Sequence, residues 1–281
     1  GPLPRALHAA VLRDSTGQPW PVVGRECYGL DPTCPAGERW LRELFGRLKR
    51  AGITHYKLDF LRVLLATDPD DPHYGLGQPS PFQAGLTRVE AYRRGLEIIR
   101  DVVGPRAHLL ACGAPLLPSA GLIDSVRIGS DITPEWETGR TGIRHCAENI
   151  RCNFFWHGRV WDNDADFLVQ PHDAPLFRHW ATAVAFSGGA ALISADLPTL
   201  TLARRRQLRR YFPAVDAVPQ PLELRPDRNG VRIVCMVGHG EETTHLIACF
   251  NRGDQPRTFA IDASEVGVPA GVKCFAWNVV L

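Results

Sequence analysis

Amphipathic helices alternate with short apolar strands between Pro35 and Phe212, and this alternation restricts the fold more than any other feature of the chain. Strands separated by helices are typical of a parallel sheet, so we expect an α/β fold. Five strands are too few for a complete eight-stranded barrel, which takes about 250 residues. Apolar residues at helical spacing predict helices over residues 35–51, 87–103, 142–153, 174–186 and 202–212. Short apolar runs predict strands over residues 53–59, 107–112, 125–129, 159–164 and 190–194. The polar stretch 66–86 is predicted to be a loop.

The pattern changes after Pro213. Residues 219–226 predict a linker, and three short strands are predicted over residues 231–237, 245–250 and 258–261, separated by turns rich in Gly, Asp and Asn. We therefore predict two domains, a partial barrel over residues 1–217 and a small antiparallel, sandwich-like β-domain over residues 218–281.

One of the three lysines in the chain, Lys57, lies in the first predicted strand. Because side chains alternate between the two faces of a strand, Lys57 and Asp59 share one face with Ile53 and His55, and residues 54, 56, 58 and 60 share the other. An amine and a carboxylate thus point the same way at the C-terminal end of a strand, where parallel barrels carry their chemistry. The alternative is an ion pair in which the two groups only neutralise each other.

A second group of polar residues follows the next two strands. The loops after residues 107–112 and 125–129 present Cys112, Arg127 and Asp131. Asp131 is thus a second acid at the C-terminal end of a strand. Glycoside hydrolysis needs two carboxyl groups, one to attack the sugar and one to protonate the leaving oxygen. Asp59 and Asp131 are our candidates for this pair.

Several ordered motifs resemble the α-galactosidases of glycoside hydrolase family 36, in the clan D barrel enzymes. They are Lys-Leu-Asp-Phe at 57–60, Cys-Gly-Ala-Pro-Leu-Leu-Pro at 112–118 and Arg-Ile-Gly-Ser-Asp at 127–131. Asn-Asp-Ala-Asp-Phe-Leu at 163–168 resembles a further family motif, usually Asn-Asp-Pro-Asp-Cys-Leu. The resemblance spans about residues 12–281. It implies the C-terminal part of a (β/α)8 TIM barrel, about five βα units, followed by a small antiparallel β-domain.

The resemblance also implies roles for the motif residues. Asp59 matches the family nucleophile and Asp131 the general acid/base, so cleavage of a terminal α-galactoside is expected to retain the anomeric configuration. Lys57 and Arg127 match residues that hydrogen-bond sugar hydroxyls, and Cys112 and Gly113 match positions that line the sugar pocket. Among the tryptophans we favour Trp136 for stacking on a sugar ring, because it follows Asp131.

Three departures from the family pattern bear on what the chain can do. Ala165 and Phe167 replace the usual Pro and Cys, and we take that motif as mainly structural. The family carries three earlier barrel strands, with a paired-Asp segment and tryptophans that grip galactose, before the point where this chain begins. Residues 275–281 stop in mid-strand by family standards. We therefore expect an internal fragment of a longer enzyme, poorly stable unless its open sheet edges are complemented.

Other functions stay open at this point. Within the same fold, the chain would suit a raffinose-synthase-like galactosyl transferase or an α-N-acetylgalactosaminidase. A Schiff-base aldolase would use Lys57 as its nucleophile, and the adjacent Asp59 argues against it. An inactive fragment, or one that only binds sugar, is the alternative outside enzymes.

The composition limits the partners. The net charge is +2 with acids and bases interleaved, which predicts no nucleic-acid partner. No apolar run approaches the roughly 20 residues of a membrane span, so we expect no membrane association. The eight cysteines include no CxxC pair, which favours reduced thiols and cytoplasmic residence. The histidines lack metal-ligand spacing, and we expect neither a metal nor another cofactor. Homo-oligomer formation is left open.

Overall fold

The structure is a computed structural model that describes residues 3, 5–22, 27–65, 80–168, 173–212, 217–222, 230–237, 243–251, 253 and 255–277. The chain divides into two compact units, Gly1–Val126 and Arg127–Leu281.

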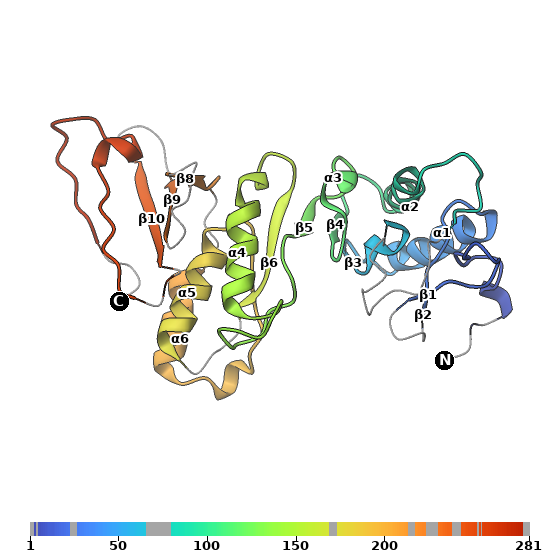
Figure 1. The fold of residues 1–281 in the computed structure, drawn as a ribbon, viewed down its shortest axis with the longest axis horizontal. Helices are drawn as coiled ribbons and strands as arrows, with labels where there is room; N and C mark the ends of the chain where they lie inside the picture. Colours follow the sequence, from blue (N-terminus) through green and yellow to red (C-terminus); the bar gives the residue numbers. More distant parts are fainter. Residues whose placement is uncertain are drawn as a thin grey trace. The chain divides into compact units, whose positions relative to one another are not determined.

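The first unit combines two long helices with the first strands of a parallel sheet (Figure 1). Its helices are η1 (Arg5–Leu7), α1 (Pro35–Arg50), η2 (Leu61–Leu65), α2 (Arg88–Val103) and α3 (Leu116–Ser119), where η marks a 3-10 helix. Its strands are β1 (Pro21–Val22), β2 (Cys27–Tyr28), β3 (His55–Leu58), β4 (His108–Ala111) and β5 (Ser125–Arg127), the last residue of which belongs to the second unit.

The long helices begin and end at residues that suit helix termini. Pro35 opens α1, where the fixed φ of proline fits the first turn. Thr87 and Glu90 form a reciprocal capping box at the start of α2. Gly104 ends α2 with a φ of 88°, which glycine adopts without steric cost. The two helices pack against each other.

The strand order of the parallel sheet is β3-β4-β5-β6-β7, where β6 is Asp162–Leu168 and β7 is Ala190–Ile193. β3 pairs with β4, β4 with β5, and β6 with β7, all in parallel. Directly after β5, the Ile128 N–H donates to the carbonyl oxygen of Asp164 in β6 at 2.9 Å. Because β3 and β4 run in the same direction, the loops that follow them leave the sheet at the same end, the C-terminal end of the strands.

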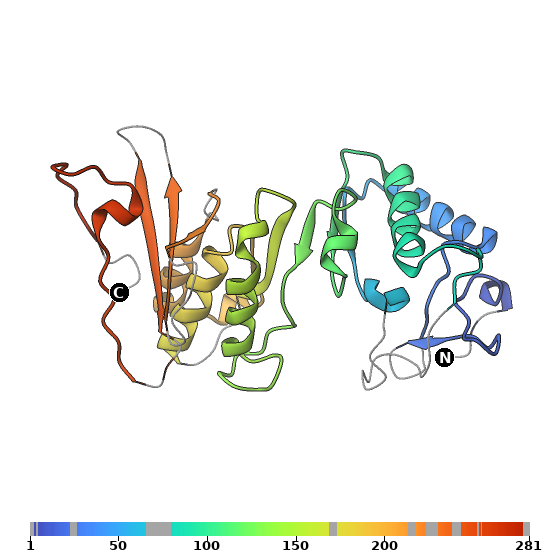
Figure 2. The same cartoon turned by 45° about the horizontal axis from the view of Figure 1, so that its top comes forward.

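The second unit joins β6 and β7 to a set of helices and an antiparallel sheet (Figure 2). In both views, α4 and α5 lie between β6 and the β9–β10 pair. Within the described residues, no helix of either unit is both long and apolar enough to cross a membrane. The helices of this unit are α4 (Ile143–Asn153), η3 (Phe154–Trp156), α5 (Ala174–Ala185), η4 (Leu197–Thr199), α6 (Leu202–Leu208), η5 (Arg209–Tyr211) and η7 (Ala263–Val266). The antiparallel sheet has the order β10-β9-β8, made of β8 (Gln220–Pro221), β9 (Gly230–Val237) and β10 (Thr244–Asn251).

The core of the second unit is built around α5. Phe177 and Trp180 are completely buried, and the Trp180 indole N–H donates to the carbonyl oxygen of Phe167 in β6 at 2.7 Å. The Arg204 guanidinium of α6 lies 4.4 Å from the centre of the Phe177 ring, a cation–π contact. These contacts hold α5 between the parallel sheet and α6.

Asn163 ties the start of β6 to its surroundings. Its buried side chain accepts the Trp161 indole N–H at 3.1 Å. Its amide donates to the carbonyl oxygens of Asn153 and Phe154, both at 3.3 Å, and of Ser187 at 3.1 Å. This fully satisfied buried amide confirms a structural role for the first residue of the 163–168 motif.

The parallel sheet and the separate antiparallel sheet confirm the α/β prediction, but three local predictions are wrong. The strand predicted at 159–164 starts at Asp162 and runs on to Leu168. Part of the predicted linker 219–226 pairs as β8, and residues 258–261 are not a strand, because a short apolar run forms one only when a neighbour pairs with it.

Two further predictions are not decided by these elements. Of the predicted loop 66–86, residues 66–79 lie outside the described part of the chain, as do residues 223–226 of the predicted linker. The domain boundary at residues 217–218 stays a prediction, whereas the two compact units divide inside β5.

Candidate active site

The end of β3 exposes Lys57 and Asp59. Tyr56 and Leu58 are buried while His55 and Lys57 are exposed, so the faces of the strand alternate as predicted. Asp59 follows the last residue of the strand and is also exposed. Within the described residues no ion pair joins the Lys57 ammonium to the Asp59 carboxylate, which leaves the self-neutralising alternative without support.

Phe60 departs from the predicted alternation. It adopts a φ of 54° and is 44% exposed, although strand geometry would have placed it on the buried face with Leu58. Its backbone N–H donates to Oδ1 of Asp59 at 2.7 Å. Such a local side-chain-to-backbone bond competes with strand geometry, and here it ends the strand. The same bond orients the Asp59 carboxylate.

The loop after β3 contacts the loop after β4. The Cys112 N–H donates to the carbonyl oxygen of Leu58 at 2.7 Å, and the Arg62 N–H donates to that of Gly113 at 2.8 Å. Gly113 has a φ of 54°, and a Cβ atom added there would lie 3.6 Å from Oδ1 of Asp59. The first unit thus brings Asp59, Cys112 and Gly113 together.

A histidine pair lies on the sheet face that carries Lys57. The His55 ring of β3 stacks on the His108 ring of β4, with centroids 4.6 Å apart and planes 9° apart. Nε2 of His108 lies 2.8 Å from Oγ of Ser125 in β5. The sequence predicted that His55 lies on this face. It did not predict the contacts of His55 with His108 and of His108 with Ser125, because alternation along one strand does not give the register between strands.

Arg127, at the end of β5, contacts three carboxylates. We call Arg127, Asp131, Asp164 and Asp166 the Arg127 cluster. Arg127 Nη1 lies 2.7 Å from Asp166 and 3.3 Å from Asp131, and Nε lies 3.0 Å from Asp164. The Arg127, Asp164 and Asp166 side chains are at most 3% exposed, whereas that of Asp131 is 88% exposed. The buried cation therefore has buried anionic partners, and Asp131 reaches solvent.

Asp166 is the most constrained member of the Arg127 cluster. Its φ is 78°, which Asp tolerates better than most residues, and the β6–β7 register is irregular between Asp164 and Phe167. Its Oδ2 accepts the Ile132 N–H at 3.0 Å and its Oδ1 accepts the Phe167 N–H at 2.8 Å. Burial raises the pKa of Asp166, while Arg127 and the two N–H donors oppose that shift.

Sequence reasoning missed Asp164 and Asp166, because the 163–168 motif was taken as mainly structural. A signal was present: the acids are two residues apart, as side chains on one face of a strand are, and they follow a strand that ends in Arg127. Within the described residues, no group of three or more His, Cys, Asp or Glu side chains is arranged to hold a metal ion.

Cys146 of α4 packs under the loop that carries Asp131. Its thiol sulfur lies 3.6 Å from the carbonyl oxygen of Ser130 and 3.8 Å from that of Asp131. Burial, aided by the negative charge of Asp166, raises the pKa of Cys146 to about 12. The group is therefore a neutral thiol at pH 7 that donates weak hydrogen bonds to this loop.

Trp136 contributes to the core of the second unit. Its ring meets the His179 ring edge-on, with centroids 5.3 Å apart. Burial lowers the pKa of His179 to about 4, so the imidazole is neutral at pH 7. The sugar-stacking role of Trp136 stays a prediction.

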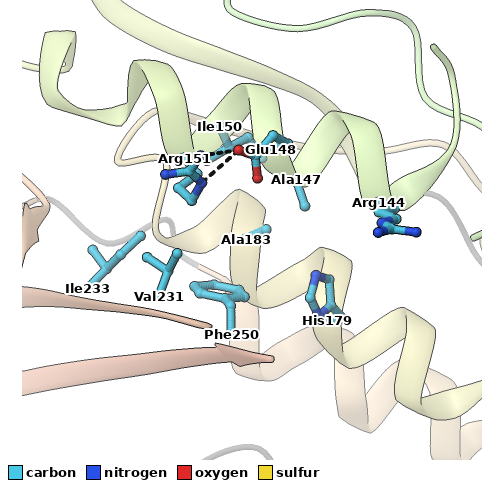
Figure 3. Close-up of a pocket in the computed structure, with 10 residues that line it drawn as sticks. All are labelled: Arg144, Ala147, Glu148, Ile150, Arg151, His179, Ala183, Val231, Ile233 and Phe250. Carbon is cyan, nitrogen blue, oxygen red and sulfur yellow. Dashed lines mark hydrogen bonds and ion pairs between the residues drawn. The ribbon is translucent and has the colours of Figure 1, made fainter. Parts of the chain in front are cut away.

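Figure 3 draws a cavity of the second unit between α4, α5 and the β9–β10 pair. The ion pair between Glu148 and Arg151 lies on its α4 side, and His179 and Phe250 lie opposite. Its volume of about 30 Å³ leaves room for water but not for a sugar. None of the predicted site residues lines it.

A scan against models of known protein families finds no match. Similar solved structures include TtGalA, an α-galactosidase from Thermus thermophilus in complex with p-nitrophenyl α-D-galactopyranoside. It shares 24% identity and a TM-score of 0.62 over 86% of this chain and 48% of that one. A family 27 β-L-arabinopyranosidase from Geobacillus stearothermophilus shares 14% identity and a TM-score of 0.62 over 92% and 58%. An α-galactosidase from Saccharomyces cerevisiae, solved with raffinose, shares 13% identity and a TM-score of 0.50 over 94% and 69%.

These similarities confirm the predicted fold, which is part of a TIM barrel followed by a small β-domain. The chain spans about half the length of TtGalA, 47% in its complex with stachyose and 48% in the complex above. With identities below 25%, the likeness establishes the fold alone.

Proposed function

We propose that this chain is part of the catalytic region of a retaining α-galactosidase. The observation that carries the proposal is a pair of exposed carboxylates, Asp59 and Asp131, each placed just after a strand of the parallel sheet. Barrel enzymes take their catalytic residues from such strand ends. The fold is shared with α-galactosidases solved with stachyose, p-nitrophenyl α-galactoside and raffinose. Family 36 is proposed over the neighbouring family 27 from the order of the motifs at 57–60, 112–118 and 127–131.

The reaction proceeds by double displacement. The Asp59 carboxylate attacks the anomeric carbon while the Asp131 carboxyl gives its proton to the glycosidic oxygen, so that the bond to the leaving group breaks and the alcohol departs. The Asp131 carboxylate then takes a proton from water, whose oxygen attacks the anomeric carbon and releases Asp59. Two inversions retain the configuration, and the course suits carboxyl groups about 5–5.5 Å apart.

The sugar-binding roles follow from the surroundings of the two acids. Lys57 is exposed on the strand that leads to Asp59 and offers an ammonium to sugar hydroxyls. Arg127 offers its guanidinium beside Asp131. Cys112 and Gly113 line the pocket next to Asp59, where the missing Cβ of Gly113 leaves room for the sugar.

The first test is hydrolysis of p-nitrophenyl α-galactoside by the chain alone and by the chain mixed with the preceding barrel segment of a similar α-galactosidase. Asp59→Asn should abolish the activity, whereas Asp196→Asn, which alters an exposed acid of the second unit, should leave it unchanged. Equal activity in both variants would refute the assignment of Asp59.

Azide separates the roles of the two acids. With Asp59→Gly, azide takes the place of the nucleophile and should yield the β-galactosyl azide. With Asp131→Gly, azide attacks the glycosyl-enzyme and should yield the α-galactosyl azide. The same anomer from both variants would contradict the proposed roles.

The remaining alternatives give different results in the same assays. A raffinose-synthase-like transferase would pass galactose to an added sugar acceptor faster than to water. A fragment that only binds sugar would give heat on titration with galactose but no turnover, either alone or in the mixture. Neither heat nor turnover would mean an inactive fragment.

A further inference from the structure

One carboxylate attaches the loop of Asp131 to β6 at two points. Oδ2 of Asp166 accepts the N–H of Ile132, the residue after Asp131, at 3.0 Å. The same oxygen lies 2.7 Å from Nη1 of Arg127, and Nη1 lies 3.3 Å from the Asp131 carboxylate. Asp166 therefore fixes both the backbone after Asp131 and the cation beside it.

Among the described residues of the second unit, Arg127 is the partner recorded for the Asp131 side chain. The Asp131 side chain is 88% exposed, and its distance of 3.3 Å to Arg127 Nη1 is longer than that of a strong charge-assisted hydrogen bond. An exposed ion pair of this kind constrains the carboxylate only weakly. A general acid must nevertheless lie within hydrogen-bond reach of the leaving oxygen. The position of the Asp131 carboxyl must therefore be set chiefly by the backbone of its loop, which Asp166 holds through the Ile132 N–H.

The backbone of Asp166 has an unusual conformation at this position. Its φ of 78° and the irregular register next to it turn the Asp166 carboxylate toward Ile132 and Arg127 instead of along a regular strand. A residue in a sparsely populated region of φ persists only where its surroundings require it, and such residues gather at functional sites. The conformation is thus what lets one carboxylate make both contacts.

We propose that Asp166 is a positioning residue that holds Asp131 against the leaving-group oxygen. The proposal rests on the function proposed above, in which Asp131 is the acid/base. Asp166 does not touch the substrate itself, because its Oδ1 accepts the Phe167 N–H and its Oδ2 is held by the Ile132 N–H and Arg127.

Asp164 provides a matched control. It lies in the same strand, is equally buried and contacts the same guanidinium, at 3.0 Å. Its other oxygen accepts the Asp166 N–H at 2.8 Å instead of a group in the Asp131 loop. Asp164→Asn therefore removes a charge from Arg127 but leaves the bond between Asp166 and Ile132 in place.

The test compares leaving groups. Asp166→Asn keeps the shape and tolerates a positive φ, but removes the charge. The specificity constant kcat/KM, which covers the steps up to departure of the phenol, is measured for phenyl and 2,4-dinitrophenyl α-galactosides. Phenolate needs the proton of Asp131, whereas dinitrophenolate leaves without it. We expect Asp166→Asn to lower kcat/KM about 100-fold for the phenyl substrate, the size of effect that a misplacement of about 1 Å causes, and only a few-fold for the other.

Asp164→Asn should lower both constants by the same factor, so that their ratio stays at the wild-type value. A ratio that stays at the wild-type value in Asp166→Asn as well would overturn the proposal, because a merely structural role lowers both constants alike. Thermal unfolding is measured for each variant, so that any variant that fails to fold is identified. In that case Asp166→Gly, which also suits the positive φ, replaces Asp166→Asn.

Amide hydrogen exchange gives a readout that does not depend on turnover. Exchange at Ile132 should rise at least tenfold in Asp166→Asn and stay at the wild-type rate in Asp164→Asn. An unchanged rate at Ile132 in Asp166→Asn would overturn the proposal even if the wild-type chain is active. If the wild-type chain hydrolyses neither substrate, alone or mixed with the preceding barrel segment, the proposed function fails, and a faster Ile132 exchange in that case shows only that Asp166 holds the loop.

Discussion

Replacing Asn163 by alanine is expected to destabilise the second unit strongly. The wild-type amide is fully buried and satisfies the Trp161 indole N–H and the carbonyl oxygens of Asn153 and Ser187, with a further bond to Phe154. Alanine leaves these groups without that partner in a region that is largely buried.

The magnitude follows from the number of groups left unpaired. The Phe154 carbonyl keeps the His157 N–H as a donor, so the indole N–H and two carbonyls lose their partner. At about 1–3 kcal/mol for each buried unsatisfied group, partly offset by relaxation, we expect a loss of about 4 kcal/mol. Since small domains have only about 5–15 kcal/mol of stability, this is a large fraction of the total.

Urea unfolding gives the assay. With a slope of about 2 kcal/mol/M, the midpoint should fall by about 2 M, and the indole N–H resonance of Trp161 should report the same transition. Asn251→Ala is the control, because that side chain is likewise an amide with hydrogen bonds to the backbone, two of them, but in a more exposed setting where water replaces them. A loss below about 1 kcal/mol, or equal losses in both variants, would refute the reasoning.

Three further predictions concern pH, a helix cap and the Asp59 loop. Burial disfavours protonation of His179 in the folded chain, whereas in the unfolded chain its pKa is about 6.5. The free energy of unfolding should therefore be highest above pH 6.5 and fall by up to about 1.4 kcal/mol per pH unit between pH 6.5 and 4. Urea midpoints between pH 7 and 4 should lose part of this slope in His179→Phe, and an unchanged slope would contradict the cause. Thr87→Ala removes the capping box of α2 and should cost about 1 kcal/mol in urea unfolding. Gly113→Ala forces a φ of 54° on a residue with a Cβ and should cost about 1–2 kcal/mol. Its methyl group, 3.6 Å from Oδ1 of Asp59, takes up space proposed for the sugar and should raise KM for the aryl galactoside. A wild-type KM would argue against a pocket at Gly113.

The helices were predictable because their ends carry local signals. Pro35 and the Thr87–Glu90 box lie in the sequence beside the helices they start, and the structure confirms both helices to within one or two residues. The strand predicted at residues 258–261 failed because strand formation depends on a partner that the segment itself does not specify.

The candidate site was predictable only in part. Lys57 and Asp59 were found from a single strand, since the alternation of faces is a local property. The contacts of Arg127 with Asp164 and Asp166 join positions more than 30 residues apart, and the contact between Asp166 and Ile132 depends on a positive φ. Alternation along one strand predicts neither.

The Arg127 cluster also sets a rule for related sequences. Two buried carboxylates that lose the arginine they share become uncompensated charges, which is far more costly than losing the whole group. Lysine would not substitute, because a single ammonium lacks the planar fork with which Arg127 meets Asp164 through Nε and Asp166 through Nη1. Positions 127, 164 and 166 should therefore change together over evolution, and relatives without an arginine at position 127 should also lack at least one of the two buried acids.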